Sequence, residues 1–215
     1  MYKKLLLVCV SAITIHTAKA QTEKGSQMIG ASFGFSTSTS NFKTFDASIN
    51  ALGPTQHSKF TTYNIGPDYS YFIADNLDLG AGVSYGYSKQ ENEAGFTFPN
   101  EQRSRAFNAG LYLRKYVLFE NKIGIRTGPY LNYNMTKLTA FDSGNPSYYN
   151  NTNKTYSGGI GLDFVYFPVK KLALAARMGN INYSHQKMEG YTEGTSNGFN
   201  ASFVNGVNFS VNYVF

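Results

Sequence analysis

Five charged residues stand within segments that otherwise alternate between apolar and small polar residues. They are Asp68, Arg114, Arg126, Asp163 and Arg177. Two carboxylates among three guanidinium groups can exchange bidentate hydrogen bonds, because the planar donor fork of arginine matches a carboxylate. Such a set has two interpretations. It is either an ion-paired layer that fills and specifies the interior of the fold, or a cation-lined constriction that selects anions.

A second group carries the residue types of a hydrolase. Ser184 and His185 are adjacent, and Glu189 and Glu193 follow them. A serine, a histidine and an acid are the elements of a catalytic triad. Adjacent residues of a strand point to opposite faces, however, so Ser184 and His185 are poorly placed for a mutual hydrogen bond. The sequence also has no nucleophile-elbow motif, and we expect no enzyme activity.

Other kinds of chemistry have little support in the sequence. There is no metal-ligand spacing and no glycine loop that would hold a phosphate, so we expect no metal and no cofactor. The formal net charge is +6 over 215 residues, and half of it belongs to the lysines of a predicted leader. This balance is mild and is weak evidence for nucleic-acid binding. We therefore expect no nucleic-acid partner.

The predicted leader has the features of an export signal. Two lysines precede an apolar stretch over residues 5–15, as in secretory signal peptides. The small-x-small cleavage site consists of Ala18, Ala20 and the following Gln21. We predict a signal peptide over residues 1–20 and a single domain over residues 21–215. The only cysteine, Cys9, would leave with the signal, so no disulfide is expected.

The elements that position the charged residues are strands. From residue 25 onward the dominant pattern is period-two alternation, which is typical of strands with unlike faces. In one segment Leu77, Leu79 and Ala81 alternate with Asp78 and Gly80. The pattern recurs eight times and predicts strands over residues 25–36, 59–74, 77–89, 104–119, 122–138, 155–169, 172–185 and 198–215. No helical period competes with it.

Every second connection between these strands is short. The short connections fall at 75–76, 120–121 and 169–171, and the long ones cover about 37–58, 90–103, 139–154 and 186–197. An even-stranded antiparallel meander with tight turns at one end and long loops at the other is typical of bacterial outer-membrane barrels. Both chain ends then lie at the tight-turn end.

Volume decides which face of the strands points outward. An eight-stranded barrel has an interior only just wide enough for side chains, so the glycine, serine, asparagine and charged face fits inside and the large apolar face does not. An apolar exterior would aggregate in water, whereas lipid requires it and barrel closure pairs the backbone groups. Only 15% of residues are charged, against about 25% in ordinary soluble domains. The predicted fold is all-β: an eight-stranded antiparallel up-and-down transmembrane β-barrel.

The last predicted strand ends in alternating large residues, Phe209, Val211, Tyr213 and Phe215. With this end and its glycine-rich strands, the chain resembles the eight-stranded outer-membrane β-barrel proteins of the OmpA/OmpX type, especially the porin-like barrels of Bacteroidetes. The resemblance covers the whole chain after the leader. It implies that these terminal residues are the signal read by the barrel-assembly machinery, and that the protein is located in the bacterial outer membrane.

Parity places the five charged residues on the inward face of such a barrel. Counted from the nearest tight turn, each lies about four to six residues into its strand, so we predict that they form one polar layer. Inward residues that can satisfy the remaining hydrogen bonds are Asn108, Tyr112, Tyr130 and Asn132.

Basic residues gather in the long loops and at the outer ends of the strands. They are Lys43, Lys59, Lys89, Arg103, Arg105, Lys137, Lys154 and Lys187. At that level they would face lipid phosphates, so we expect outer-membrane lipids, including lipopolysaccharide, as partners. The polar long loops can hydrogen-bond adaptably and suit an unknown extracellular ligand.

These features predict a monomeric barrel with a largely filled polar lumen. We expect a structural or adhesin-like surface-interaction protein of the envelope. The alternative is a small porin-like channel for small solutes or anions. A lipid-modifying outer-membrane enzyme is a third interpretation, favoured only if Ser184 or His185 is essential to an activity.

Overall fold

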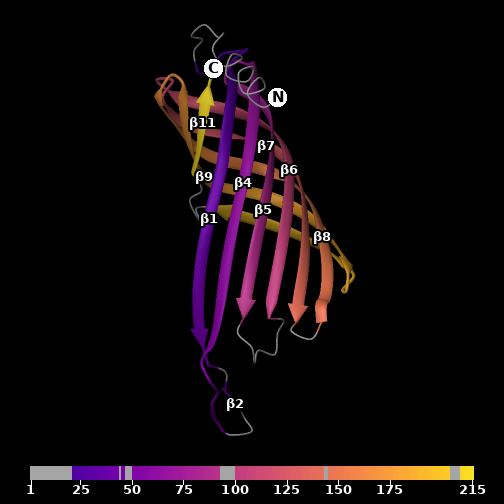
Figure 1. The fold of residues 1–215 in the computed structure, drawn as a ribbon. Helices are drawn as coiled ribbons and strands as arrows, with labels where there is room; N and C mark the ends of the chain where they lie inside the picture. Colours follow the sequence, from indigo (N-terminus) through magenta and orange to yellow (C-terminus); the bar gives the residue numbers. More distant parts are fainter. Residues whose placement is uncertain (1–20, 44, 47–49, 93–99, 143–144, 204–208) are drawn as a thin grey trace, which may run out of the picture.

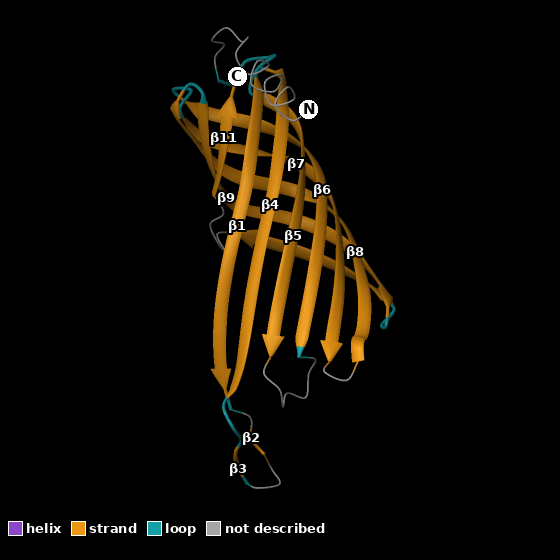
Figure 2. Cartoon of the chain, viewed as in Figure 1, coloured by secondary structure: helices purple, strands orange, loops and turns teal. Residues whose placement is uncertain are grey.

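The computed structural model describes residues 21–43, 45–46, 50–92, 100–142, 145–203 and 209–215. Nearly all of them belong to strands (Figure 2). The long strands are β1 (Gln27–Phe42), β4 (Gln56–Ala74), β5 (Leu77–Asn92), β6 (Glu101–Phe119), β7 (Ile123–Asp142), β8 (Asn145–Val169), β9 (Leu172–Gly190), β10 (Gly194–Phe203) and β11 (Phe209–Val214). A small separate hairpin is formed by β2 (Phe45–Asp46) and β3 (Ala51–Leu52).

The long strands form a closed antiparallel ring. Strand β1 pairs with β4, and each strand from β4 to β9 pairs with the next one along the chain. The eighth position of the ring is shared by β10 and β11, because both pair with β9. The ring closes where residues 28–31 of β1 pair with residues 211–214 of β11. Beyond Ala31, the described part of β1 pairs only with β4, and β10 pairs only with β9. The predicted fold class, an eight-stranded up-and-down barrel, is confirmed, and the start of β1 and the end of β11 lie at the same end of it (Figure 1).

The tight turns are confirmed at that end. Two-residue connections at 75–76 and 170–171 and a three-residue one at 120–122 join successive strands. Asn76, Glu120 and Asn121 have positive φ values of 59°, 49° and 54°, a backbone region in which asparagine is enriched. The amide of Lys122 donates to the carbonyl of Phe119 at 3.0 Å and closes its turn.

The predicted long connections were wrong in extent. Residues 139–154 contain only a two-residue gap between β7 and β8, and residues 186–197 contain only Tyr191–Glu193 outside β9 and β10. The hydrogen-bonded ladders continue through these segments. Alternation fades there because both faces of a strand that leaves the barrel wall are polar, whereas pairing depends on the backbone. The outer end of the molecule therefore consists of extended hairpins.

The two faces of the sheet have different environments. Large outward side chains are exposed, with Ile65 58% and Leu131 67% accessible. The inward face is polar through the middle of the barrel, but at the tight-turn end an apolar cluster fills it: Met28, Phe72, Tyr116, Val165, Phe167, Ala173 and Val214. The sequence prediction of a polar lumen is therefore corrected at that end, where Phe72 follows Asp68 and Ser70 on the same face of β4.

One extra residue changes the alternation within β9. Asp163 of β8 pairs with Arg177, and the adjacent Leu162 pairs with Gly179, so Met178 has no partner in β8. This β-bulge reverses which parity faces inward. Arg177 lines the lumen before it, and Ile181 and Tyr183 lie outward and exposed after it.

We expect a methyl group at Gly128 to weaken the barrel. A Cβ atom there would overlap the carbonyl oxygen of Leu113 in the neighbouring strand, so Gly128→Ala must displace backbone, which costs about 1–2 kcal/mol. The matched control is Gly86→Ala, because the nearest atom to a Cβ at Gly86 lies 3.8 Å away. Urea unfolding of the folded barrel in detergent measures both. Equal midpoints for the two variants would contradict the close strand approach.

Candidate functional site

The first part of the charged site is a buried ion pair between β5 and β6. Arg114 donates through Nε to Oδ1 of Asp78 at 3.1 Å, and its Nη2 donates to Oδ2. The hydroxyl of Tyr116 donates to the same carboxylate at 3.1 Å. Asp78 is fully buried, so three hydrogen bonds satisfy a charge that water does not reach.

The second part lies on β7, β8 and β9 and is centred on one carboxylate. Arg126 donates to Oδ2 of Asp163 at 2.9 Å, and Arg177 donates to Oδ1 at 3.2 Å. The side chains of Arg126 and Asp163 are buried, whereas that of Arg177 is 54% exposed. Arg126 and Arg177 therefore bind the same carboxylate, but the Arg126 side chain is shielded from solvent and the Arg177 side chain is not.

Tyr116 joins the two parts. Its hydroxyl donates to Asp78 and accepts from Nη1 of Arg126 at 3.4 Å. Asp68 joins at the other side, because Tyr112 donates to its Oδ2 at 3.4 Å and the guanidinium of Arg114 lies 3.8 Å from the centre of the Tyr112 ring. The result is one connected layer across six neighbouring strands, β4 to β9.

The predicted five residues thus have unequal places in this layer. Arg126 and Arg177 each bind Asp163 directly, Arg114 is linked to them through Asp78 and Tyr116, and Asp68 lies at the edge. Of the predicted polar neighbours, only Tyr112 bonds to the layer. Tyr130 accepts from Asn180 at 3.1 Å, and Asn108 donates to Ser84 at 3.0 Å, away from the charges.

Sequence reasoning missed Asp78 and Tyr116. Asp78 is the second residue after a tight turn, a position usually at the solvent boundary. The available signal was the register that this turn sets, which places Asp78 opposite Arg114. Tyr116 has the same parity as Arg114 and completes the set.

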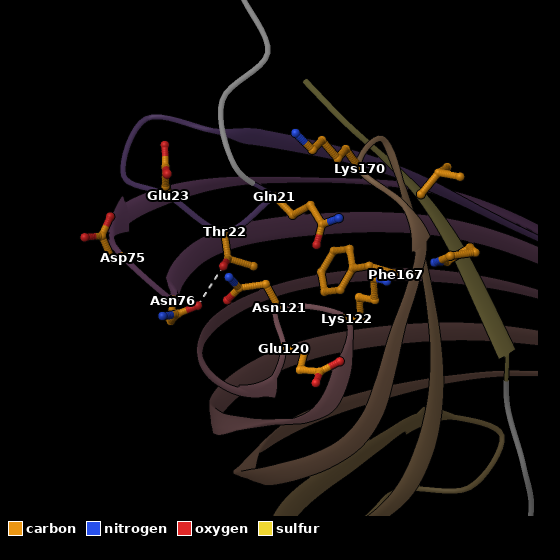
Figure 3. Close-up of a pocket in the computed structure, with 12 residues that line it drawn as sticks. Gln21, Thr22, Glu23, Asp75, Asn76, Glu120, Asn121, Lys122, Phe167 and Lys170 are labelled. Carbon is orange, nitrogen blue, oxygen red and sulfur yellow. Dashed lines mark hydrogen bonds between the residues drawn. The ribbon is translucent and has the colours of Figure 1, made fainter.

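The layer separates two regions of different character. On its outer side lies a cavity of about 260 Å³, lined by residues that include Arg177, Asn132 and Tyr130. On its other side the apolar cluster fills the lumen down to Phe167. Below Phe167 the tight turns line a separate, partly open pocket of about 790 Å³ at the end of the barrel, where Thr22 donates to Asn76 at 2.6 Å (Figure 3).

The structure does not assemble the hydrolase residues. Nδ1 of His185 lies 2.8 Å from Oδ1 of Asn197, and the hydroxyl of Ser184 is directed to the carbonyl of Gly198 at 3.5 Å. Glu189 is bound by Lys154 at 2.7 Å. The serine, the histidine and the acid therefore have separate partners.

The described residues contain neither a metal-binding cluster nor a membrane-spanning helix. No group of three or more histidine, cysteine, aspartate or glutamate side chains is close enough to hold a metal ion among them. Nor does the described part of the chain contain a helix that is long and apolar enough to cross a membrane.

The predicted processing and assembly residues have the following places. Ala18 and Ala20 lie outside the described residues, and Gln21 is the first residue described. In β11, Phe209 pairs with Ala176, Val211 is exposed on the outward face, and the rings of Tyr213 and Phe215 lie 6.1 Å apart. The backbone of Phe215 exchanges hydrogen bonds with Gln27 and completes the closure of the ring.

A comparison with models of known protein families agrees with this architecture. A family model described as "Outer membrane protein beta-barrel domain" matches residues 5–215. Among solved structures, Ail, the attachment invasion locus protein of Yersinia pestis, has 12% sequence identity and a TM-score of 0.42, with 89% of this chain and 99% of Ail covered. OprG of Pseudomonas aeruginosa has 13% identity and a TM-score of 0.43, with 92% and 99% covered.

A longer protein also matches over part of its length. The ferric yersiniabactin uptake receptor FyuA of Yersinia pestis has 13% identity and a TM-score of 0.35, covering 89% of this chain and 32% of the receptor. No curated protein matches the chain at a significant level.

Proposed function

Because the chain belongs to the family of outer membrane protein beta-barrel domains, we propose that it is an integral barrel of the bacterial outer membrane that acts as a structural or surface-interaction protein. The observation that carries this proposal is the obstruction of the lumen. Phe72, Tyr116 and Phe167 are each at most 2% exposed inside the ring. The ion-paired layer lies directly against them through Tyr116.

Opening the obstructed lumen would cost a large free energy. A solute passing along the axis would have to separate the paired carboxylates and guanidinium groups and also displace packed aromatic rings. Leaving one partner of a buried ion pair uncompensated costs about 3–5 kcal/mol. A barrel built this way is suited to hold a fixed shape in the membrane rather than to conduct.

The outer hairpins supply the surface for an interaction role. Strands β8 and β9 extend to a tip at which Tyr191 is 73% exposed, and its ring lies 5.7 Å from that of Tyr149. Exposed tyrosines give rigid contact area with a polar end. This supports binding of an extracellular ligand at the hairpin tips.

Export and assembly are part of the same proposal. A signal peptide over residues 1–20 would direct the chain out of the cytoplasm, with cleavage before Gln21. The outward alternation of Val211 and Tyr213 near the end of the chain would serve recognition by the barrel-assembly machinery.

A second candidate function is a small anion channel. The observation in its favour is Arg177, which is half exposed and lines the cavity of about 260 Å³ on the outer side of the layer. A hydrated guanidinium at this place would attract anions into the lumen. The apolar cluster below it opposes this function.

Planar-bilayer conductance tests the two functions. We expect wild-type barrel, shown to be folded by a gel shift between boiled and unboiled samples, to give no discrete openings. The double variant Phe72→Ala and Phe167→Ala removes two rings of the obstruction but leaves the ion-paired layer in place, so we expect it to give no discrete openings either. Wild-type openings with an anion preference that falls in Arg126→Ala and Arg177→Ala would establish the channel instead.

A further inference from the structure

A shallow groove crosses the outward face of the barrel over β5 to β9. Its volume is about 740 Å³. Small residues form its floor, Ala81, Ala109 and Gly158, and larger side chains stand around them, among them Leu131, Tyr133 and Tyr156. Leu131 and Tyr156 are more than half exposed, so the groove opens to the surroundings of the barrel and not to its lumen.

The floor and walls follow from the register of the strands. Ala81, Leu111, Leu131 and Gly158 lie in one cross-strand row. The adjacent row toward the outer end contains Ala109, Tyr133 and Tyr156, and the rings of Tyr133 and Tyr156 lie 5.1 Å apart. Small side chains beside large ones in successive rows leave an elongated depression. Its shape and its apolar walls suit a hydrocarbon chain.

Two basic residues lie beyond the outer end of the groove. Arg105 and Lys137 pair directly across β6 and β7, and both side chains are exposed on the outward face. Like charges directly opposite one another are destabilising. No carboxylate among the described residues lies within ion-pairing distance of either of them, so the pair lacks a protein counter-charge in the part of the chain that the structure describes.

The neighbouring basic residues differ in this respect. Lys89 lies 3.0 Å from Glu101, and Lys154 and Lys187 lie 2.7 and 2.8 Å from Glu189. The hydrogen bonds from Lys154 and Lys187 lower the pKa of Glu189 to about 2. Glu189 therefore stays ionised at neutral pH and forms ion pairs with both Lys154 and Lys187. Arg105 and Lys137 are left to bind an external anion.

The spacing between the basic pair and the groove matches a lipid. Arg105 precedes Ala109, and Lys137 follows Tyr133, by four residues, which is about 13 Å along a strand. We propose that this face binds a phosphorylated lipid of the outer leaflet, with its phosphate between Arg105 and Lys137 and an acyl chain in the groove. The proposal rests on the outer-membrane location proposed above.

The absence of tryptophan from the chain allows a direct test. Leu131→Trp places one fluorescent reporter in the groove, and Ile65→Trp places one on the outward face of β4, outside it. Each barrel is reconstituted in phosphatidylcholine vesicles, and quenching is compared between phosphatidic acid and phosphatidylcholine that carry bromine at the same acyl position. Because the bromine is at the same depth in both lipids, the ratio of the two quenching efficiencies does not depend on the depth of the reporter.

We expect the Leu131→Trp reporter to prefer phosphatidic acid by at least about fivefold, since each basic residue near the surface adds about 1 kcal/mol of attraction to an anionic lipid. The Ile65→Trp reporter should show a ratio near one. Adding Arg105→Gln and Lys137→Gln should abolish the preference. Lys170→Gln with Lys171→Gln, which removes the same charge at the tight-turn end, should leave it unchanged.

A variant of the groove floor tests the acyl-chain part. Ala109→Phe fills the groove without changing charge, and we expect it to weaken quenching of the Leu131→Trp reporter by both brominated lipids. No preference at Leu131→Trp, or a preference that survives loss of Arg105 and Lys137, would overturn the site. A folded, non-conducting barrel with either result would leave the proposed function standing and remove only the lipid site.

Discussion

Replacing Asp78 with asparagine is expected to lower the free energy of unfolding in detergent by about 3 kcal/mol or more. The substitution keeps the shape of the side chain but removes the charge that faces Arg114, whose side chain is only 13% exposed. It also puts an amide where Tyr116 now donates a hydrogen bond. Urea titration followed by the gel shift of the folded barrel measures the loss.

The control is Glu193→Gln, the same acid-to-amide change at an exposed position between β9 and β10. We expect it to leave the unfolding midpoint within experimental error, because isolated surface charges contribute little. If Asp78→Asn were as stable as Glu193→Gln, the layer would not contribute to stability and its charges would have to be explained by function.

The arginines that share Asp163 are expected to differ strongly from each other. Arg126→Ala should cost about 2–3 kcal/mol, because Arg126 is buried and its loss leaves Asp163 with a single partner. Arg177→Ala should cost less than about 1 kcal/mol, because half of that side chain is exposed and water replaces its hydrogen bond.

The double variant gives a further check on this pair. With both arginines gone, Asp163 is a buried carboxylate without a cation, so the combined loss should exceed the sum of the single losses. Equal effects of the two single variants would mean that exposure does not set the strength of these ion pairs. Strict additivity would mean that Arg126 and Arg177 do not share Asp163 in solution.

Much of the barrel could be predicted from the sequence, and the physical reason is the simplicity of strand geometry. A period of two assigns every second residue to one face, and tight turns hold asparagine where the backbone needs positive φ, as at Asn76 and Asn121. These local rules placed Arg126 and Asp163 inside. They also located the three tight turns and the ring of eight strand positions.

The rest depended on information that lies outside any single strand. The pairing of Asp78 with Arg114 follows from register, and the apolar cluster at the tight-turn end follows from how seven side chains from six strands share one volume. The extent of the outer hairpins depends on backbone hydrogen bonds, which polar sequences such as residues 145–157 form as well as apolar ones. The hydrophobic pattern of the sequence therefore does not predict this ion pair, this cluster or the length of these hairpins.

The bulge at Met178 has a consequence for how this chain can change. Strand β9 has two frames of alternation. Odd-numbered residues face inward before Met178 and outward after it, so Met178 is the boundary between the two frames. Before the boundary the frame directs Arg177 to the charged layer, and after it the frame directs Ile181 and Tyr183 to the exterior. Deleting Met178 itself would remove the bulge and leave Arg177 opposite Asp163 and Gly179 opposite Leu162, whereas deleting a residue elsewhere in β9 would turn every later side chain of the strand to the opposite face. Met178 is therefore the one position of β9 at which a single-residue deletion keeps the inward and outward sides of the strand unchanged.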